Sequence, residues 1–240
     1  MACQNVFRRY ELKYLLDEQQ HTAVMKAVHA HMIPDRYAHS AIRSLYFDTD
    51  NYRLARHSIE KPVYKEKLRL RSYGQAGPGS TVFVELKKKY QKVVYKRRIP
   101  MQEQCAMAWL QGEQDGPDDS QISQEIGYFL RYYGTLHPVV FLSYERDAYR
   151  MAGQEDLRVT FDHEIRGRLD DLSLCCETHG KRLLAQGMTL MEIKCAASMP
   201  LWMAHTLTEA GICRASFSKY GIIYQREICP RLTKGAMIHA

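Results

Sequence analysis

The chain has 240 residues, of which 45% are hydrophobic and 25% are charged, so it can bury a sizeable core without disulfides or structural metals. Its net charge of +7 and isoelectric point of about 9.0 favour an anionic partner over a cationic one. Nucleic acid, an acidic membrane surface and a polyphosphate-like ligand all have that sign, and composition alone does not choose among them.

The cysteines and the N-terminus indicate the compartment. The seven cysteines are odd in number and form no Cys-x-x-Cys pair, which indicates free thiols in a reducing compartment and argues against a zinc site. Residues 1–14 lack the apolar core of a signal peptide, and no apolar run approaches the roughly 20 residues that span a bilayer. We therefore expect a soluble, cytoplasmic protein without a transmembrane segment.

The first half of the chain is predicted to be rich in strands. A strand over 8–16 precedes a helix over 17–33, which Asp17 caps and Pro34 ends. A strand over 42–48 and a short helix over 49–57 follow. Three strands come next, over 63–73, 82–90 and 92–99, and the glycine-rich run 74–79 predicts a turn between the first two.

The second half mixes helices and strands. Helices are predicted over 101–110, 120–133, 201–210 and 217–228, and strands over 139–149, 157–166 and 188–194. Short connections favour antiparallel pairing, and the central strands lack the intervening helices of a doubly wound sheet. We find no internal repeat and no dividing linker. The sequence therefore predicts one domain of the α+β class, built on a large antiparallel sheet or barrel.

Charged residues alternate with other residues inside these strands. Residues two apart in a strand point to the same face, so each strand presents a charged face. The sets that share a face are Lys65, Lys67, Arg69 and Arg71; Glu85, Lys87 and Lys89; Lys92, Lys96 and Arg98; Tyr144, Arg146 and Arg150; and Arg158, Thr160, Asp162 and Glu164.

Two interpretations of this alternation are open. A solvated outer face produces the same pattern on any single strand. Its recurrence would place like charges on neighbouring strands, where they repel unless an anion or solvent separates them. A basic concave face with single carboxylates, such as Glu85 and Glu192, suits a polyphosphate with its metal, because Arg and Lys bind phosphate oxygens and carboxylates bind Mg²⁺ or Mn²⁺.

Eight short segments of the chain resemble, in order, those of one known family. They are RYELK at 9–13, SLYFD at 44–48, KLRLR at 67–71, VELK at 84–87, SYER at 143–146, LRVTFD at 157–162, LMEIK at 190–194 and SFSKY at 216–220. This series resembles the VTC domain, the polyphosphate polymerase domain of the CYTH, or triphosphate tunnel metalloenzyme, superfamily. The resemblance extends from about residue 7 to about residue 225.

The resemblance implies a fold and an activity. The fold is a closed antiparallel β-tunnel of about eight strands, with helices packed outside. In the family, ATP binds in the tunnel with Mn²⁺ or Mg²⁺, and its γ-phosphoryl group passes to a growing polyphosphate chain. ATP and polyphosphate or triphosphate are thus the expected ligands.

The resemblance also implies roles for individual residues. Arg69 and Arg71 resemble the triphosphate clamp, and Glu192 resembles the metal-binding glutamate, with Glu85 and Glu11 as further candidate metal ligands. The other candidate phosphate ligands or catalytic residues are Lys13, Lys87, Lys96, Tyr144, Arg146, Arg158, Ser218 and Lys219. For Lys96, the neighbouring Lys92, Arg97 and Arg98 are alternatives.

Departures from the family pattern leave other functions open. Many hydrolases of the superfamily begin with Glu-x-Glu-x-Lys, but the corresponding run here starts with Arg9, which favours the polymerase branch over a triphosphatase or nucleotidyl cyclase. Ser216 stands where a cation would strengthen the phosphate site. A non-catalytic polyphosphate sensor is a third possibility, and a membrane-protein partner would be needed for export. Nucleic acid is not expected, because only alternate residues of the Lys87 to Lys89 run share a face.

Overall fold

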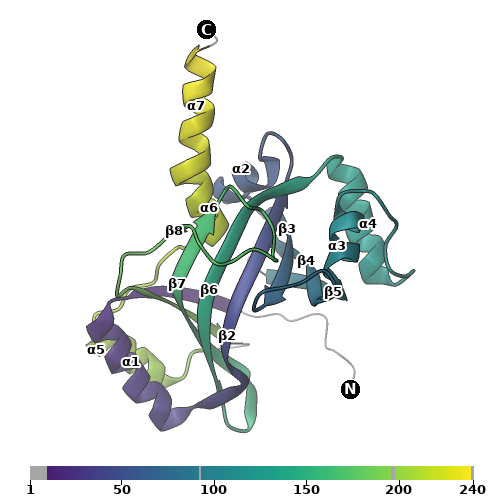
Figure 1. The fold of residues 1–240 in the computed structure, drawn as a ribbon. Helices are drawn as coiled ribbons and strands as arrows, with labels where there is room; N and C mark the ends of the chain where they lie inside the picture. The colour runs from purple at the N-terminus through teal and green to yellow at the C-terminus, as the bar shows by residue number, and fades with distance from the viewer. Residues whose placement is uncertain (1–9, 92, 196–197, 239–240) are drawn as a thin grey trace.

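A single antiparallel sheet dominates the computed structural model, which describes residues 10–91, 93–195 and 198–238 (Figure 1). The strands run in the order β1-β9-β7-β6-β2-β3-β4-β5, and β8 pairs with β7. They are β1 (Tyr10–Leu16), β2 (Ile33–Asp48), β3 (Tyr64–Tyr73), β4 (Thr81–Tyr90), β5 (Val93–Gln102), β6 (His137–Met151), β7 (Gln154–Arg168), β8 (Lys181–Arg182) and β9 (Thr189–Cys195). The predictions that involve Arg9 and Lys92, and the first two residues of the strand predicted over 8–16, lie outside the described residues.

The helices lie around this sheet, as the α+β class predicts. They are α1 (Glu18–His31), α2 (Arg53–Ile59), α3 (Glu103–Leu110), α4 (Gln121–Tyr133), α5 (Leu201–Glu209), α6 (Lys219–Ile223) and α7 (Cys229–Ile238). Asp17 caps α1 as predicted: its carboxylate accepts from the Gln20 amide at 2.8 Å, and the Gln20 side chain accepts from the Asp17 amide. No helix among the described residues is long and apolar enough to cross a membrane.

Several predicted boundaries are wrong for physical reasons. β2 begins at Ile33 rather than at residue 42, because its polar and largely exposed first half pairs with β6 through a bulge. Pro34 therefore lies inside β2, after α1 has already ended at His31. The helix predicted over 217–228 is α6 followed by a π-helical turn, and α7 continues it to Ile238. The two-residue strand β8 is too short to give a periodic signal.

The apolar faces of the strands point outward and lie under helices. Leu68, Leu70, Val84 and Leu86 are fully buried in a cluster that includes Trp109 of α3 and residues of α4. At the other end of the strand order, on the same outer face, α1 and α5 lie side by side and bury the outward residues of β1, β7 and β9 (Figure 1). The charged faces therefore point inward. Of the two interpretations of the charge alternation, the solvated outer face is thus wrong. We call this concave side of the sheet the inner face.

The two edge strands of the sheet, β1 and β5, are not joined by a backbone ladder in the described residues. In the described part of the chain, β1 pairs only with β9, and β5 pairs only with β4. Lys87 of β4 nevertheless reaches Glu11 of β1, with 3.0 Å between Nζ and Oε2. The sheet thus has the predicted class, but among the described residues its edges are not closed by backbone hydrogen bonds, and an ion pair links β1 to β4 across the inner side.

Candidate functional site

Four cations surround one carboxylate on the part of the inner face that β3, β4 and β5 form. Glu85 is fully buried, and its oxygens lie 2.7 Å from Arg69 Nη2 and 2.7 Å from Lys96 Nζ. The Nε atoms of Arg98 and Arg71 are 3.6 and 3.8 Å from the same carboxylate. We call these five residues the clamp wall. Antiparallel register produces it, because Glu85 lies opposite Arg69 on one side and Arg98 on the other.

The clamp wall has more positive charge than its own carboxylate neutralises. Burial by itself raises the pKa of Glu85, but Arg69, Arg71 and Lys96 outweigh burial and hold that pKa well below its usual range. Burial lowers the pKa of Lys96 to about 8, against the attraction of Glu85. An anion with several negative oxygens would relieve the remaining repulsion.

Hydroxyl groups from β2 and β6 hold the two clamp arginines in place. Arg69 Nη1 donates to the Tyr46 hydroxyl at 3.0 Å, and Arg71 donates to the Ser44 and Tyr144 hydroxyls at 3.2 and 3.0 Å. Burial raises the pKa of Tyr46, but Arg69 and other nearby cations outweigh it and lower the pKa to about 7. These donors and acceptors fix the guanidinium planes before any ligand arrives.

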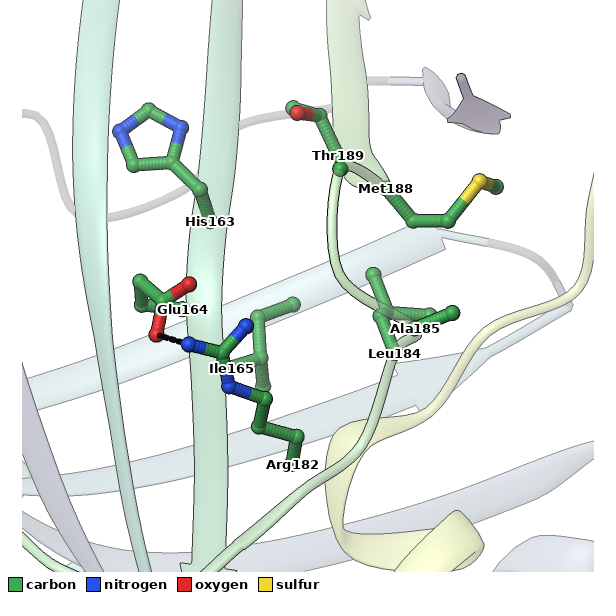
Figure 2. A pocket seen from close by; sticks show the side chains of 9 residues that line it. His163, Glu164, Ile165, Arg182, Leu184, Ala185, Met188 and Thr189 are labelled. Atoms are coloured by element: carbon green, nitrogen blue, oxygen red, sulfur yellow. Dashed lines mark ion pairs between the residues drawn. The ribbon is translucent and has the colours of Figure 1, made fainter. Parts of the chain in front are cut away.

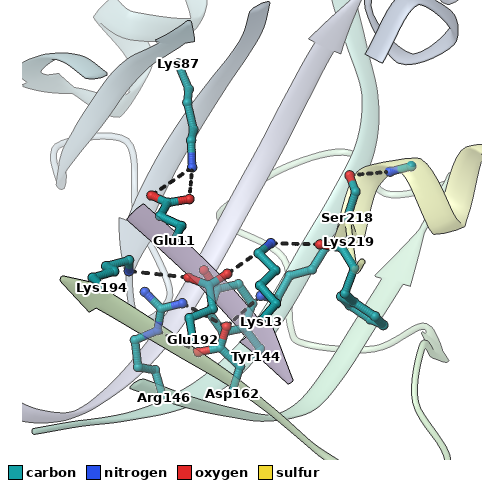
Figure 3. A network of polar contacts seen from close by, with 12 residues as sticks. Glu11, Lys13, Lys87, Tyr144, Arg146, Asp162, Glu192, Lys194, Ser218 and Lys219 are labelled. Carbon is teal, nitrogen blue, oxygen red and sulfur yellow. Dashed lines mark hydrogen bonds and ion pairs between the residues drawn. The ribbon is translucent and has the colours of Figure 1, made fainter. Parts of the chain in front are cut away.

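Three carboxylates lie on the part of the inner face that β1, β7 and β9 form, as Figure 3 shows. Glu192 accepts ion pairs from Lys13 at 3.1 Å and from Lys194 at 3.3 Å. Glu11 of β1, which lies opposite Lys194 in the register with β9, pairs with Lys87. Burial raises the pKa of Glu192, but Lys13 and Lys194 outweigh it and hold the pKa well below the usual range, so the group stays ionised.

Asp162 is the third of these carboxylates, and it is fully buried. Arg146 donates to both of its oxygens, at 2.6 and 2.8 Å, and Lys219 donates to one of them at 2.6 Å. Burial raises its pKa, but Arg146 and Lys219 outweigh burial and lower the pKa to about 2. We call Glu11, Asp162, Glu192 and their partners the carboxylate wall; the partners are Lys13, Lys87, Arg146, Lys194 and Lys219.

Helix α6 carries Ser218 and Lys219 into this site. Ser218 caps the helix, accepting from the Gly221 amide at 3.1 Å, and its hydroxyl also accepts from Lys67 Nζ at 2.9 Å. The Tyr220 hydroxyl donates to Asp48 Oδ2 at 2.6 Å. Asp48 is itself fully buried and accepts from two backbone amides at the start of α2, so it ties α6 to the end of β2.

Sequence reasoning missed or misplaced several of these residues. Lys67 and Asp162 lie on faces that alternation predicted, but only their partners, Ser218 and Arg146, were singled out. Tyr46 and Lys194 were not assigned, although both fall inside the quoted segments. Arg158 of β7 was assigned as a phosphate ligand, and its Nε lies 2.8 Å from Oδ2 of Asp35 in β2.

Glu164 does not share the inner face with Arg158, contrary to the prediction. Its φ of 48° breaks the strand alternation, and its carboxylate pairs with Arg182 at 2.9 Å instead. It lines a cavity of about 150 Å³ beside β7 and β8, whose lining includes none of the residues that the resemblance assigns (Figure 2).

The carboxylates differ in how well they suit a divalent cation. Hard carboxylate oxygens are the ligands that Mg²⁺ and Mn²⁺ prefer. Glu11 and Glu192 fit this requirement, because they are partly accessible, with side-chain exposures of 21% and 10%, and each is paired with flexible lysines. Glu85 does not fit, because it is fully buried among four cations of the clamp wall.

Solved structures support the same class of fold. A Bacillus halodurans protein named as an adenylate cyclase candidate superposes with a TM-score of 0.56 and 15% identity, covering 94% of this chain and 100% of that one. A Hippeastrum protein, described as an adenylyl cyclase candidate with a dominant triphosphatase activity, superposes with a TM-score of 0.55 and 17% identity. The match covers 91% of this chain and 96% of that one. At this level of identity, these two structures support the fold of the curved antiparallel sheet alone.

The chain belongs to the VTC domain family, whose model matches residues 8–227. It is also 27% identical, over 148 residues, to subunit 4 of the vacuolar transporter chaperone complex of Schizosaccharomyces pombe. That match covers 52% of this chain and 20% of the length of the relative.

Proposed function

We propose that this VTC domain is a metal-dependent phosphotransferase that passes the γ-phosphoryl group of ATP to a growing polyphosphate chain. The observation that carries the proposal is the clamp wall, where four preorganised cations share one buried carboxylate. Such a surplus of guanidinium and ammonium groups suits a ligand with many phosphate oxygens. The carboxylate wall lies on the same inner face and offers ligands for a cation.

Phosphoryl transfer does not require the protein to form a covalent bond with the substrate. A terminal oxygen of the polyphosphate chain would attack the γ-phosphorus, the bond from that phosphorus to the bridging oxygen would break, and ADP would leave. Arg69 and Arg71 would orient the phosphates and neutralise their oxygens, which is how most phosphoryl-transfer sites act. Lys13, Lys87, Lys96, Tyr144, Arg146, Arg158, Ser218 and Lys219 are the other proposed ligands.

The divalent cation would be held by Glu192 and Glu11. A cation held there would supply positive charge that neutralises the charge developing on the phosphate oxygens. We assign Glu85 a different role from the one expected: it orients the clamp cations and keeps them apart from one another. Asp162 would do the same for Arg146 and Lys219.

A membrane-protein partner is part of the proposal. The Schizosaccharomyces pombe relative is by name a subunit of a vacuolar transporter chaperone complex, although the match covers only 20% of it. We propose that this domain makes its product beside a membrane-protein partner that takes it up. ATP and polyphosphate, rather than nucleic acid, would be its ligands.

The test is to incubate the purified protein with ATP and Mn²⁺ and to resolve the products on a gel that separates polyphosphate by length. We expect a ladder, and we expect Arg71→Ala to abolish it while the circular dichroism spectrum stays native. Free phosphate, pyrophosphate or a cyclic nucleotide without a ladder would replace the proposal with a hydrolase or a cyclase. Tight polyphosphate binding without consumption of ATP would replace it with a sensor.

A further inference from the structure

Two aromatic rings gather around Arg98, the clamp-wall residue whose guanidinium lies beside both of them. Tyr73 is the last residue of β3, and its side chain is 49% exposed. The Phe83 ring lies edge-on to it, with 5.8 Å between ring centroids. The Arg98 guanidinium lies 3.4 Å from the Phe83 ring centroid and 5.6 Å from that of Tyr73. We call these three residues the aromatic rim.

Strand register places the aromatic rim on the inner face. Phe83 lies opposite Arg71, and Arg98 lies opposite Glu85, so both belong to the rows that form the clamp wall. Tyr73 follows Arg71 by two residues and points to the same face, about 7 Å further along the strand. That distance is close to the span of a ribose between its phosphate and its base.

The opposite end of the same strands has a different chemistry. There the inner face continues to Lys65 and Lys89, which lie opposite each other in the register. Burial and the neighbouring lysines lower the pKa of Lys65, and its Nζ donates to the Ser58 carbonyl. An anionic chain suits that end, whereas a flat, uncharged group suits the rim. On the inner face, the two ends of β3 and β4 that flank the clamp wall therefore differ in chemistry.

We propose that the aromatic rim is a nucleoside subsite, in which the base of a nucleoside triphosphate stacks against Tyr73 and Arg98 while its phosphates occupy Arg69 and Arg71. The inference rests on the proposed function and adds the direction in which the nucleotide lies. Stacking recognises the flat face that every base has, and an arginine over a ring adds a cation–π contribution. The subsite should thus favour nucleotides over inorganic tripolyphosphate and discriminate weakly between adenine and guanine.

The test compares two ligands that share the triphosphate but not the base. The affinities of ATP and of inorganic tripolyphosphate are measured by titration calorimetry for the parent and for Tyr73→Ala, with the same divalent cation throughout. We expect Tyr73→Ala to weaken ATP about tenfold and to leave tripolyphosphate within about twofold, because stacking contributes only with a base present. Tyr73→Phe keeps the ring and should bind both ligands as the parent does.

A matched control comes from the other end of β4. Tyr90 is 46% exposed, and its alternation along β4 puts it on the side opposite Phe83 and Glu85. Tyr90→Ala should therefore leave both affinities unchanged. An unchanged ATP affinity in Tyr73→Ala, or an equal loss for both ligands, would overturn the nucleoside subsite. The proposed function is tested separately by Arg71→Ala, which should weaken both ligands whatever Tyr73 does.

Discussion

The two walls of the inner face use the same side chains in different proportions. The clamp wall sets four cations around one fully buried carboxylate. The carboxylate wall instead divides its cations among Glu11, Asp162 and Glu192, so each carboxylate has one or two partners. Four cations share one carboxylate in the first arrangement, whereas five cations share three carboxylates in the second, so the clamp wall has the larger ratio of positive to negative charge.

This difference separates two tasks that one ligand requires. A wall with surplus positive charge, rigidly held by Tyr46, Ser44 and Tyr144, is suited to bind phosphate oxygens. In the carboxylate wall, Glu11 and Glu192 pair with lysines and keep 21% and 10% of their side-chain surface exposed, so a cation can replace those lysines at lower cost. The predictions below test whether the two walls act in this divided way.

The largest effect is expected at the clamp wall. Arg71→Ala removes a buried guanidinium that would orient phosphate oxygens, so turnover of ATP should fall by about 100-fold or more. Arg182→Ala serves as the control. Arg182 lies in β8 and pairs with Glu164, away from the clamp wall, so this variant should leave turnover unchanged. Equal steady-state rates for Arg71→Ala and the parent would show that the clamp wall does not hold the substrate.

Glu85→Gln should reduce stability and change its response to ligand. It leaves the clamp cations without their shared carboxylate, which should lower the free energy of unfolding by about 3 kcal/mol. Tripolyphosphate would restore the missing negative charge, so it should raise the melting temperature of the variant more than that of the parent. A smaller ligand-induced rise in thermal unfolding experiments would contradict the assigned role of Glu85.

Glu192→Gln should act on the cation rather than on the nucleotide. Removing one charged ligand should shift the Mn²⁺ concentration for half-maximal activity upward by about tenfold. ATP affinity measured without a divalent cation should change little. Superimposable Mn²⁺ activation curves for variant and parent would refute the division between the walls.

The smallest effect is a dependence of binding on pH. Burial lowers the pKa of Lys67 to about 7 with the help of the nearby Lys13, Lys65 and Lys87, against the attraction of Tyr46. The ammonium is therefore present below pH 7 and lost above it, and affinity for tripolyphosphate should fall severalfold between pH 7 and pH 9. Titration calorimetry at several pH values should show a steeper fall for the parent than for Lys67→Met. Parallel curves would remove Lys67 from the site.

Alternation along the chain predicted much of the inner face. The run Lys65, Lys67, Arg69, Arg71 identified one charged face of β3, and the apolar residues between them lie under α3 and α4 as a two-sided strand requires. The helix cap at Asp17 was equally readable, because capping depends only on neighbouring residues. These features are local, so the sequence contains them directly.

Features that depend on register between distant strands could not be predicted. The four partners of Glu85 come from β3 and β5, and the Tyr220 to Asp48 hydrogen bond joins residues 172 positions apart. Glu164 was predicted to lie on the inner face, but its positive φ breaks the strand alternation. Since the residue is not a glycine, the sequence contains no signal of this bulge. The edge between β1 and β5 likewise depends on how far the whole sheet curves.

The most direct test of the account is a crystal structure with tripolyphosphate and Mn²⁺, in which anomalous scattering locates the metal. The account predicts phosphate oxygens bound by Arg69 and Arg71, with the manganese peak beside Glu192. Manganese bound by Glu85, or tripolyphosphate bound away from the inner face, would contradict the division of the site into two walls.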